Sequence, residues 1–222
     1  MTIKIAHFVG WLALCVPVGL AAQPTTVEFI QYVNEAPLKM DIYAPQNTND
    51  LPTGQSAYGP IVIFVFGGGF LAGSRNDAIY LPYYNFLTRQ GYAVAAIDYR
   101  LGLKDSRKPP SLFNRKPLIN AISFAVEDLY AATNYLLKHA KTLHIDTTRI
   151  MLSGSSAGAI TALQADYEKR NNLNNAKVLP VAFQYAAIIS FAGAIFSREG
   201  KPDYAVAADA TVPWCQRQLG SL

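Results

Sequence analysis

Apolar residues along the chain form two kinds of pattern. Continuous apolar runs that end in turn residues predict strands buried on both faces of a sheet. These runs cover residues 61–66, 92–97, 150–152 and 185–191. Apolar residues at helical spacing predict helices between the strands, over residues 83–90, 119–143 and 159–167. Because strand and helix alternate, the pattern predicts an α/β fold with a mostly parallel central sheet and helices on both faces.

The segments outside these elements predict two further strands and several loops. The strands are predicted over residues 27–33 and 38–43, ahead of the central ones. Polar residues with Gly, Asn and Pro predict surface loops over residues 47–60 and 168–177. The basic, proline-containing segment 104–117 is either a plain connector or a loop that covers or contacts a substrate.

Residues 1–22 have the pattern of a cleavable signal peptide. Lys4 supplies the positive charge, an apolar run follows, and small residues end it, so cleavage is expected after Ala21 or Ala22. The apolar run is shorter than the roughly 20 residues that a membrane span requires. We therefore expect a secreted or periplasmic protein without stable membrane insertion, in which residues 23–222 form one domain; the alternative is an uncleaved anchor.

Composition narrows the possible functions. Hydrophobic residues make up 51% of the 222 residues, which is enough to build one sizeable core. The net charge of +4 is small and scattered, which does not favour a nucleic-acid partner. Cys15 would leave with the signal peptide, so Cys215 would be unpaired, and no Cys/His cluster indicates a metal. We expect no metal and no cofactor, and the composition does not indicate an oligomeric state.

The sequence Gly154-Ser-Ser-Ala-Gly158 follows the apolar run 150–152 and precedes a helical run. Gly-x-Ser-x-Gly between a strand and a helix is typical of a nucleophile elbow, in which the serine sits on a sharp, strained turn. The residues two before and two after the serine must then be nearly free of side chain. The motif predicts that Ser156 exposes its hydroxyl, and that the backbone N–H of Ala157 points toward the same place.

Three glycines, Gly67 to Gly69, directly follow the apolar run 61–66. Glycines after a strand let backbone N–H groups approach a ligand without obstruction by a Cβ atom. The alternative is a flexible loop without a specific role. The order of the two motifs favours an oxyanion-binding loop for the first and a nucleophile for the second.

These motifs resemble the α/β-hydrolase superfamily, and especially secreted bacterial-type carboxylesterases and lipases with a Gly-Gly-Gly oxyanion loop, similar to type-B carboxylesterases. Two further phrases support the resemblance, Asp41-x-Tyr-x-Pro45 and Asp98-Tyr-Arg100. Phe66 stands where the family has a His or Tyr before the glycines. That family position supports the loop and takes no part in the chemistry, so the departure leaves the resemblance intact.

The resemblance implies an α/β-hydrolase three-layer sandwich and a serine carboxylic-ester hydrolase that forms an acyl-enzyme. Ser156 would be the nucleophile, and the N–H groups of Gly68, Gly69 and Ala157 would form the oxyanion hole. The substrate would be a small-molecule or carbohydrate-linked ester. Two alternatives remain open: a non-catalytic binding protein with this fold, and a serine peptidase with this fold.

Near its end the chain departs from the family pattern. The family order is serine, acid, histidine, but no histidine follows His144. His139 and His144 precede the elbow and are interpreted as residues at or after a helix end. Neither Asp203 nor Asp209 can be assigned as the acid. We therefore expect a chain that is truncated at its C-terminus, lacks the last strands and has impaired activity.

Residues 208–217 offer one explanation for this end. Read one base out of frame, their codons permit a sequence that resembles the family's acid-bearing strand, so a frameshift is one hypothesis and a fragment or a natural end are the others. The remaining charged residues are interpreted as structural: Asp98 and Arg100 in ion pairs and turn contacts, and Glu127 and Asp128 as adjacent helix charges.

Overall fold

The predicted alternation of strands and helices is confirmed by a computed structural model, which describes residues 23–32, 35–46, 59–106 and 114–195. The predicted signal peptide, most of the 47–60 loop and everything after residue 195 lie outside the described residues. The strands are β1 (Thr25–Ile30), β2 (Leu38–Tyr43), β3 (Gly59–Val65), β4 (Ala93–Ile97), β5 (Ile145–Ser155) and β6 (Ile188–Phe191). The helices are α1 (Leu81–Arg89), α2 (Lys116–Lys138) and α3 (Ala157–Arg170), with short 3-10 helices η1 (Ala78–Tyr80) and η2 (Asn174–Val178).

The six described strands form one sheet in the order β1-β2-β4-β3-β5-β6. The β1–β2 and β2–β4 pairs are antiparallel, while β4, β3, β5 and β6 run parallel to one another. In the register, Val65 at the end of β3 lies beside Gly154 near the end of β5. The carboxyl ends of the two strands that carry the sequence motifs therefore meet at the same edge.

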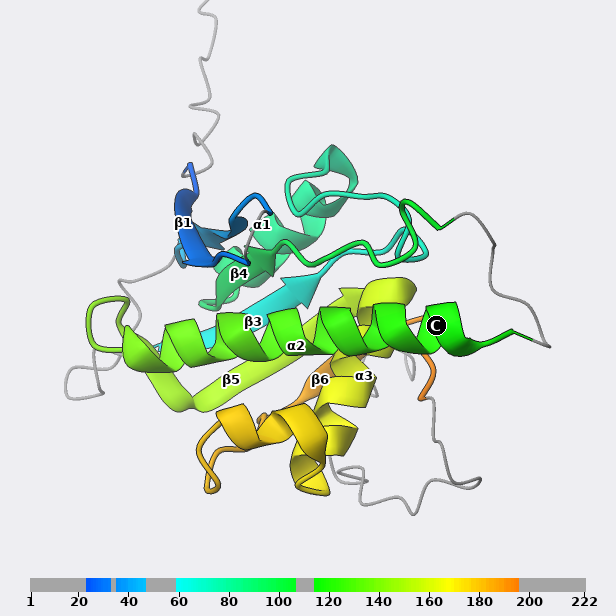
Figure 1. Ribbon diagram of the computed structural model, residues 1–222. Coiled ribbons are helices and arrows are strands. Elements are labelled where there is room, and N and C mark those ends of the chain that lie inside the picture. Colours follow the sequence, from blue (N-terminus) through cyan, green and yellow to red (C-terminus); the bar gives the residue numbers. More distant parts are fainter. Residues whose placement is uncertain (1–22, 33–34, 47–58, 107–113, 196–222) are drawn as a thin grey trace, which may run out of the picture.

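Helices cover both faces of this sheet, which makes three layers (Figure 1). Phe64 and Ser153 are neighbours in the register, and both contact Tyr83 of α1. Neighbouring residues of a strand point to opposite faces. Gly154 accordingly faces the other layer, where it packs against Gly158 of α3. The Tyr130 hydroxyl of α2 donates to the Ala165 carbonyl of α3 (2.7 Å), so α2 and α3 share that layer.

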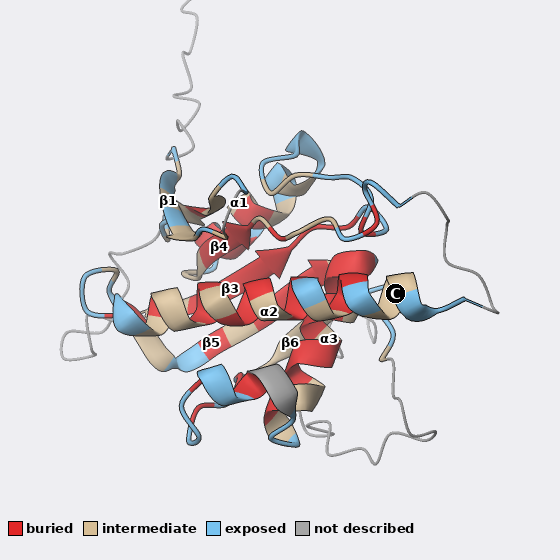
Figure 2. Cartoon of the chain, in the orientation of Figure 1, coloured by how far each residue is buried: buried red, intermediate tan, exposed pale blue. Residues whose placement is uncertain are grey.

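The core lies on both sides of β3. Each side chain from Ile61 to Val65 is at most 1% exposed. Figure 2 shows the buried residues on β3 and on the inward faces of α2 and α3. Burial of apolar surface contributes about 25 cal/mol per Å², and burial on two faces is the main force that stabilises such a strand.

Several predicted boundaries were wrong. The helix predicted to reach residue 143 ends at Lys138, because the His139 N–H closes the last turn on Tyr135 and the chain then turns through His144 at φ +53°. The helix begins at Lys116, where Pro117 fits the first turn, so that part of the predicted 104–117 loop is helical. The predicted 168–177 loop is helical to Arg170 and contains most of η2.

Among the described residues, no helix is both long enough and apolar enough to cross a membrane.

Candidate active site

The strand-to-helix turn at Ser156 has the geometry of a nucleophile elbow. β5 ends at Ser155 and α3 begins at Ala157, with Ser156 between them at φ +50° and ψ −114°. The Ser156 side chain is exposed, whereas the neighbouring residues of α3 are buried. The Ser156 N–H donates to the Phe191 carbonyl (2.8 Å), and its carbonyl accepts from the Ile160 N–H (2.9 Å). These bonds hold a conformation that L-residues rarely adopt.

The two glycines of the motif are required by close backbone contacts. A Cβ atom on Gly158 would lie 2.0 Å from the Val65 carbonyl oxygen, and one on Gly154 would lie 2.4 Å from Gly158. Both distances are far shorter than van der Waals contact. The small residues therefore allow α3 to start directly against the ends of β3 and β5.

The triple-glycine loop lies against this turn. Gly68 has φ +121°, and a Cβ atom there would lie 1.9 Å from the Ala72 carbonyl oxygen, so only glycine fits. A Cβ atom on Gly67 would lie 2.9 Å from the Ser155 carbonyl oxygen. The predicted oxyanion loop and the predicted nucleophile are thus brought to one edge of the sheet.

The proposed oxyanion donors have no competing acceptors in the described part of the chain. Gly68 and Gly69 are exposed, and their N–H groups make no hydrogen bond to any described residue. The Ala157 N–H is at the first position of α3, where no intrahelical acceptor exists. Free N–H groups at a helix start and in a glycine loop are suited to bind a developing negative charge.

Aromatic residues of the α1 layer lie beneath the elbow. The Tyr83 hydroxyl is hydrogen-bonded to the Ser153 hydroxyl (3.1 Å), and the Tyr83 ring packs edge-on against Phe191. Burial raises the pKa of the Tyr83 hydroxyl above its usual value, which favours its neutral form. Tyr83 therefore serves as a neutral hydrogen-bonding partner of β5 in this position.

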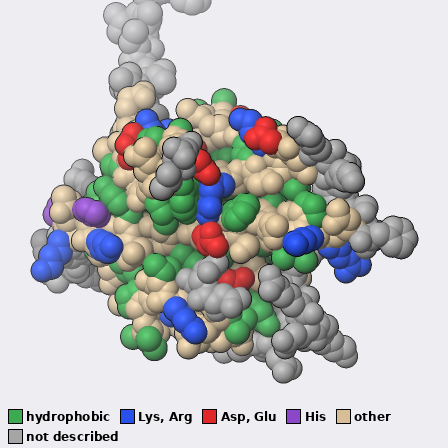
Figure 3. Space-filling view, in the orientation of Figure 1, with side chains coloured by type: hydrophobic (Ala, Val, Ile, Leu, Met, Phe, Trp, Pro, Cys, Tyr) green, Lys and Arg blue, Asp and Glu red, His purple; other side chains and the backbone are tan. Residues whose placement is uncertain are grey.

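Neither described histidine lies near Ser156. His144 directly precedes β5 and Ser156 directly follows it, so the length of the neighbouring strand β3, on the order of 20 Å, separates them. The His139 ring stacks on Tyr135, and its Nδ1 lies 2.9 Å from the Tyr135 carbonyl oxygen. The purple side chains in Figure 3 lie at one margin of the molecule. The interpretation of both as residues at or after a helix end is confirmed.

Two arginines make the ion pairs expected around the loop after β4. Arg75 contacts Asp98 (2.6 Å) and the buried Asp41 (3.0 Å), and thereby anchors the chain that leaves the glycine loop. Arg100 contacts both Glu127 (2.8 Å) and Asp128 (2.9 Å). The structural interpretation of Asp98 and Arg100 is confirmed. The adjacent carboxylates of α2 nevertheless converge on one cation, because the guanidinium fork spans both.

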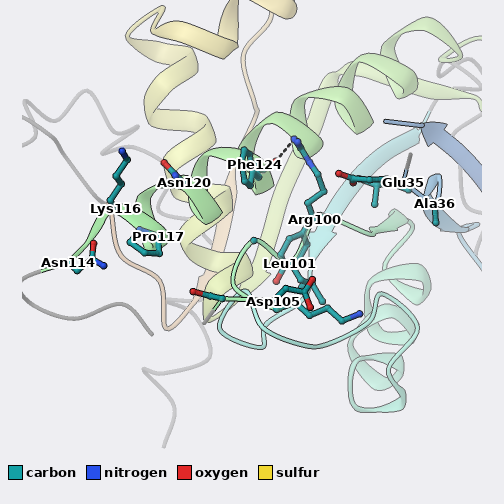
Figure 4. Close-up of a pocket in the computed structure, with 15 residues that line it drawn as sticks. Glu35, Ala36, Arg100, Leu101, Asp105, Asn114, Lys116, Pro117, Asn120 and Phe124 are labelled. Carbon is teal, nitrogen blue, oxygen red and sulfur yellow. Dashed lines mark hydrogen bonds between the residues drawn. The ribbon is translucent and has the colours of Figure 1, made fainter. Parts of the chain in front are cut away.

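A hollow of about 990 Å³ lies beside this region, between the segment after β4 and the start of α2 (Figure 4). Its charged lining includes Glu35, Arg100, Lys104 and Lys116, with Phe124 as an aromatic wall. Ser156 and the glycine loop do not line it. Residues on both sides of the segment 107–113 contribute to it, and that segment lies outside the described residues.

Sequence reasoning missed the residues that support the site from a distance. Tyr80 contacts the glycine loop, Arg75 anchors its exit, and the Phe191 carbonyl holds Ser156. None carries a local motif, because each acts through a partner far away in the sequence. Among the described residues, no group of three or more His, Cys, Asp or Glu is arranged to hold a metal ion.

Comparison with known proteins identifies the family. The BD-FAE family matches residues 40–197, a range that includes both motifs. Fumonisin B1 esterase of Sphingopyxis macrogoltabida is 30% identical over 102 residues, which is 45% of this chain and 18% of that protein. The chain spans about a fifth of the length of the curated relatives it matches.

Solved structures agree with the family match. A propionate-bound esterase of the Planctomycetes species Thermogutta terrifontis has a TM-score of 0.57 and 24% identity, covering 83% of this chain and 60% of that one. A bacterial heroin esterase has a TM-score of 0.50 and 28% identity, covering 72% and 42%. The chain therefore belongs to the BD-FAE family, and its fold is the α/β-hydrolase fold of carboxylesterases.

Proposed function

We propose that this protein hydrolyses carboxylic esters with Ser156 as the nucleophile. The observation that carries the proposal is the exposed Ser156 on a strained turn beside the triple-glycine loop, where Gly154 and Gly158 pack against each other. The names of the relatives, which are esterases, support an ester of a small molecule as the substrate class.

In the proposed reaction, the Ser156 oxygen attacks the carbonyl carbon of the ester and its proton passes to a base. The N–H groups of Gly68, Gly69 and Ala157 stabilise the oxyanion, each contributing about 3 kcal/mol. The bond to the leaving alcohol then breaks, and the alcohol takes up the proton. Water hydrolyses the acyl-enzyme in a second step and restores the serine.

The base is the component that the described residues do not supply, since neither His139 nor His144 is near Ser156. We therefore propose that the 222-residue chain by itself acylates slowly. An oxyanion hole with bound substrate retains part of the rate enhancement when triad members are lost.

Covalent labelling tests the proposal without requiring turnover. Incubation with a fluorophosphonate, followed by mass spectrometry, is expected to place one phosphonyl group on Ser156. Ser156→Ala should remove the label, whereas Ser155→Ala, a matched change one residue earlier, should keep it. A label on another residue, or no label after an incubation long enough for the slow acylation that we propose, would contradict the assignment.

Substrate class is tested separately. We expect any measurable turnover to occur with p-nitrophenyl acetate and to disappear in Ser156→Ala. Preference for a peptide anilide over the ester would instead support the peptidase alternative.

A further inference from the structure

The peptide unit that leads into the glycine loop is held at both of its polar groups by tyrosine hydroxyls. The Tyr99 hydroxyl donates to the Phe66 carbonyl (3.0 Å), and the Gly67 N–H donates to the Tyr80 hydroxyl (3.0 Å). Phe66 C=O and Gly67 N–H belong to one planar peptide unit. Its orientation is therefore fixed from two sides, by Tyr80 of η1 and by Tyr99 of the segment after β4.

Both tyrosines are themselves held in place by packing. The Tyr99 ring is 3% exposed and stacks on Phe66, with ring centroids 4.4 Å apart. Tyr80 ends η1, and its ring packs on Phe64 at 4.8 Å. Phe64 is a residue of β3 and Phe66 directly follows that strand, so the strand that precedes the loop also positions the two hydroxyls.

The Gly67–Gly68 peptide unit, which carries the Gly68 N–H, makes no hydrogen bond to a described residue, whereas the Gly68 carbonyl accepts from the N–H groups of Leu71 (3.0 Å) and Ala72 (3.2 Å). These two bonds hold the next unit, which carries the Gly69 N–H. Gly67 is buried, whereas Gly68 and Gly69 are exposed and lack the Cβ atoms that would limit rotation. Without the Tyr80 hydroxyl, the buried Gly67 N–H would have no acceptor among the described residues. The peptide unit would then rotate to find a partner, and the rotation would change the direction of the Gly68 N–H in the following unit.

The same peptide unit also contacts the elbow. A Cβ atom on Gly158 would lie 2.5 Å from the Phe66 carbonyl oxygen. A change in the orientation of the Phe66 carbonyl would therefore alter the relation between the glycine loop and Ser156.

We propose that Tyr80 and Tyr99 are positioning residues, which clamp the Phe66–Gly67 peptide unit and so set the oxyanion-binding direction of the Gly68 N–H group. This inference rests on the proposed function, because it assigns the clamp a role in the reaction of Ser156.

The test compares three variants that each remove one hydroxyl bonded to a backbone group. Tyr80→Phe and Tyr99→Phe break the clamp. Tyr130→Phe is the matched control, because the buried Tyr130 hydroxyl donates to the Ala165 carbonyl of α3 (2.7 Å) and not to the Phe66–Gly67 unit or to a residue that anchors the glycine loop. The second-order rate of Ser156 labelling by a fluorophosphonate is measured by mass spectrometry, together with the melting temperature.

Tyr80→Phe and Tyr99→Phe are each expected to lower the labelling rate about 10-fold, less than the loss of a whole oxyanion donor. Any ester turnover should lose kcat with little change in KM, since the clamp affects the charged intermediate and not ground-state binding. The double variant should lose little more than the larger single loss, because both hydroxyls act on one peptide unit. Tyr130→Phe should stay within about twofold of the unmodified rate even where its melting temperature falls equally.

Equal labelling rates in Tyr80→Phe, Tyr99→Phe and Tyr130→Phe would overturn the inference. The outcome is separable from the proposed function: loss of label in Ser156→Ala with unaffected clamp variants refutes the clamp alone. Failure of the unmodified protein to label at Ser156 even in the long incubation refutes the proposed function and the clamp together.

Discussion

Ser156 combines an exposed side chain with a backbone conformation that costs about 1–3 kcal/mol. The surrounding residues maintain this conformation through hydrogen bonds to Phe191 and Ile160 and through tight contact of Gly158 with β3. The strain is therefore located at the residue that we propose as nucleophile. The turn is possible because Gly154 and Gly158 on either side of it have no side chains.

Gly158→Ala is expected to destabilise the fold by about 3 kcal/mol, because the new Cβ atom would overlap the Val65 carbonyl oxygen and neither backbone can move easily. Urea denaturation measures the loss. Gly59→Ala is the control, because a Cβ atom there meets nothing within 4 Å, and it should change stability by less than about 0.5 kcal/mol. Equal effects of the two substitutions would contradict the close contact at Gly158.

At the scale of elements, one buried carboxylate ties α2 to two other parts of the fold. Asp128 accepts hydrogen bonds from the backbone N–H (2.7 Å) and the guanidinium of Arg100, a residue that follows β4. It also accepts from the hydroxyl of Tyr32, a residue that follows β1. The Asp128 side chain is fully buried. Helix α2 therefore docks through a specific polar contact as well as through its apolar face.

Asp128→Asn is expected to lower the free energy of unfolding by about 3 kcal/mol, because the amide nitrogen cannot accept from Arg100 or Tyr32 and the buried pair loses a charge. Glu28→Gln is the matched control at an exposed pair with Lys39, where the loss should not exceed about 1 kcal/mol. Chemical denaturation of both variants compares them. If Asp128→Asn lowers the free energy of unfolding no more than Glu28→Gln does, the buried pair does not hold the helix.

At the scale of the whole molecule, the parallel sheet determines where the site lies. The glycine loop leaves β3 and the elbow leaves β5, and these strands are neighbours with their carboxyl ends at one edge. Ligands of open parallel sheets bind outside such an edge. The fold therefore brings together two motifs that are separated in sequence by more than 80 residues.

We propose that the whole protein is exported and that residues 1–21 or 1–22 are removed in the process. The exported protein is expected to begin at Ala22 or Gln23, which N-terminal sequencing determines. Leu14→Arg should block export, because it places a charge in the apolar run. Exported protein that retains Met1 would show that the segment is not cleaved.

The sequence alone predicted the alternation of elements, the elbow and the glycine loop, because each follows from local rules. Buried strands appear as apolar runs, and a strained turn requires Gly154 and Gly158 at fixed spacing. Helix ends were predicted less well. Apolar residues continue beyond Lys138, but the chain turns at His139 and then enters β5, which pairs with β3 from Ile145 onward. The truncation and frameshift hypotheses concern residues outside the described part and stay predictions.

Only the tertiary structure decided which distant residues support the site. Tyr80 and Tyr99 lie 13 and 33 positions beyond the groups that they contact, and no local pattern distinguishes them from core aromatics. The same holds for Arg75, which joins Asp41 and Asp98 across three segments. Local spacing determines a turn or a strand, whereas the partner of a hydroxyl or a charge depends on which strands become neighbours in the sheet.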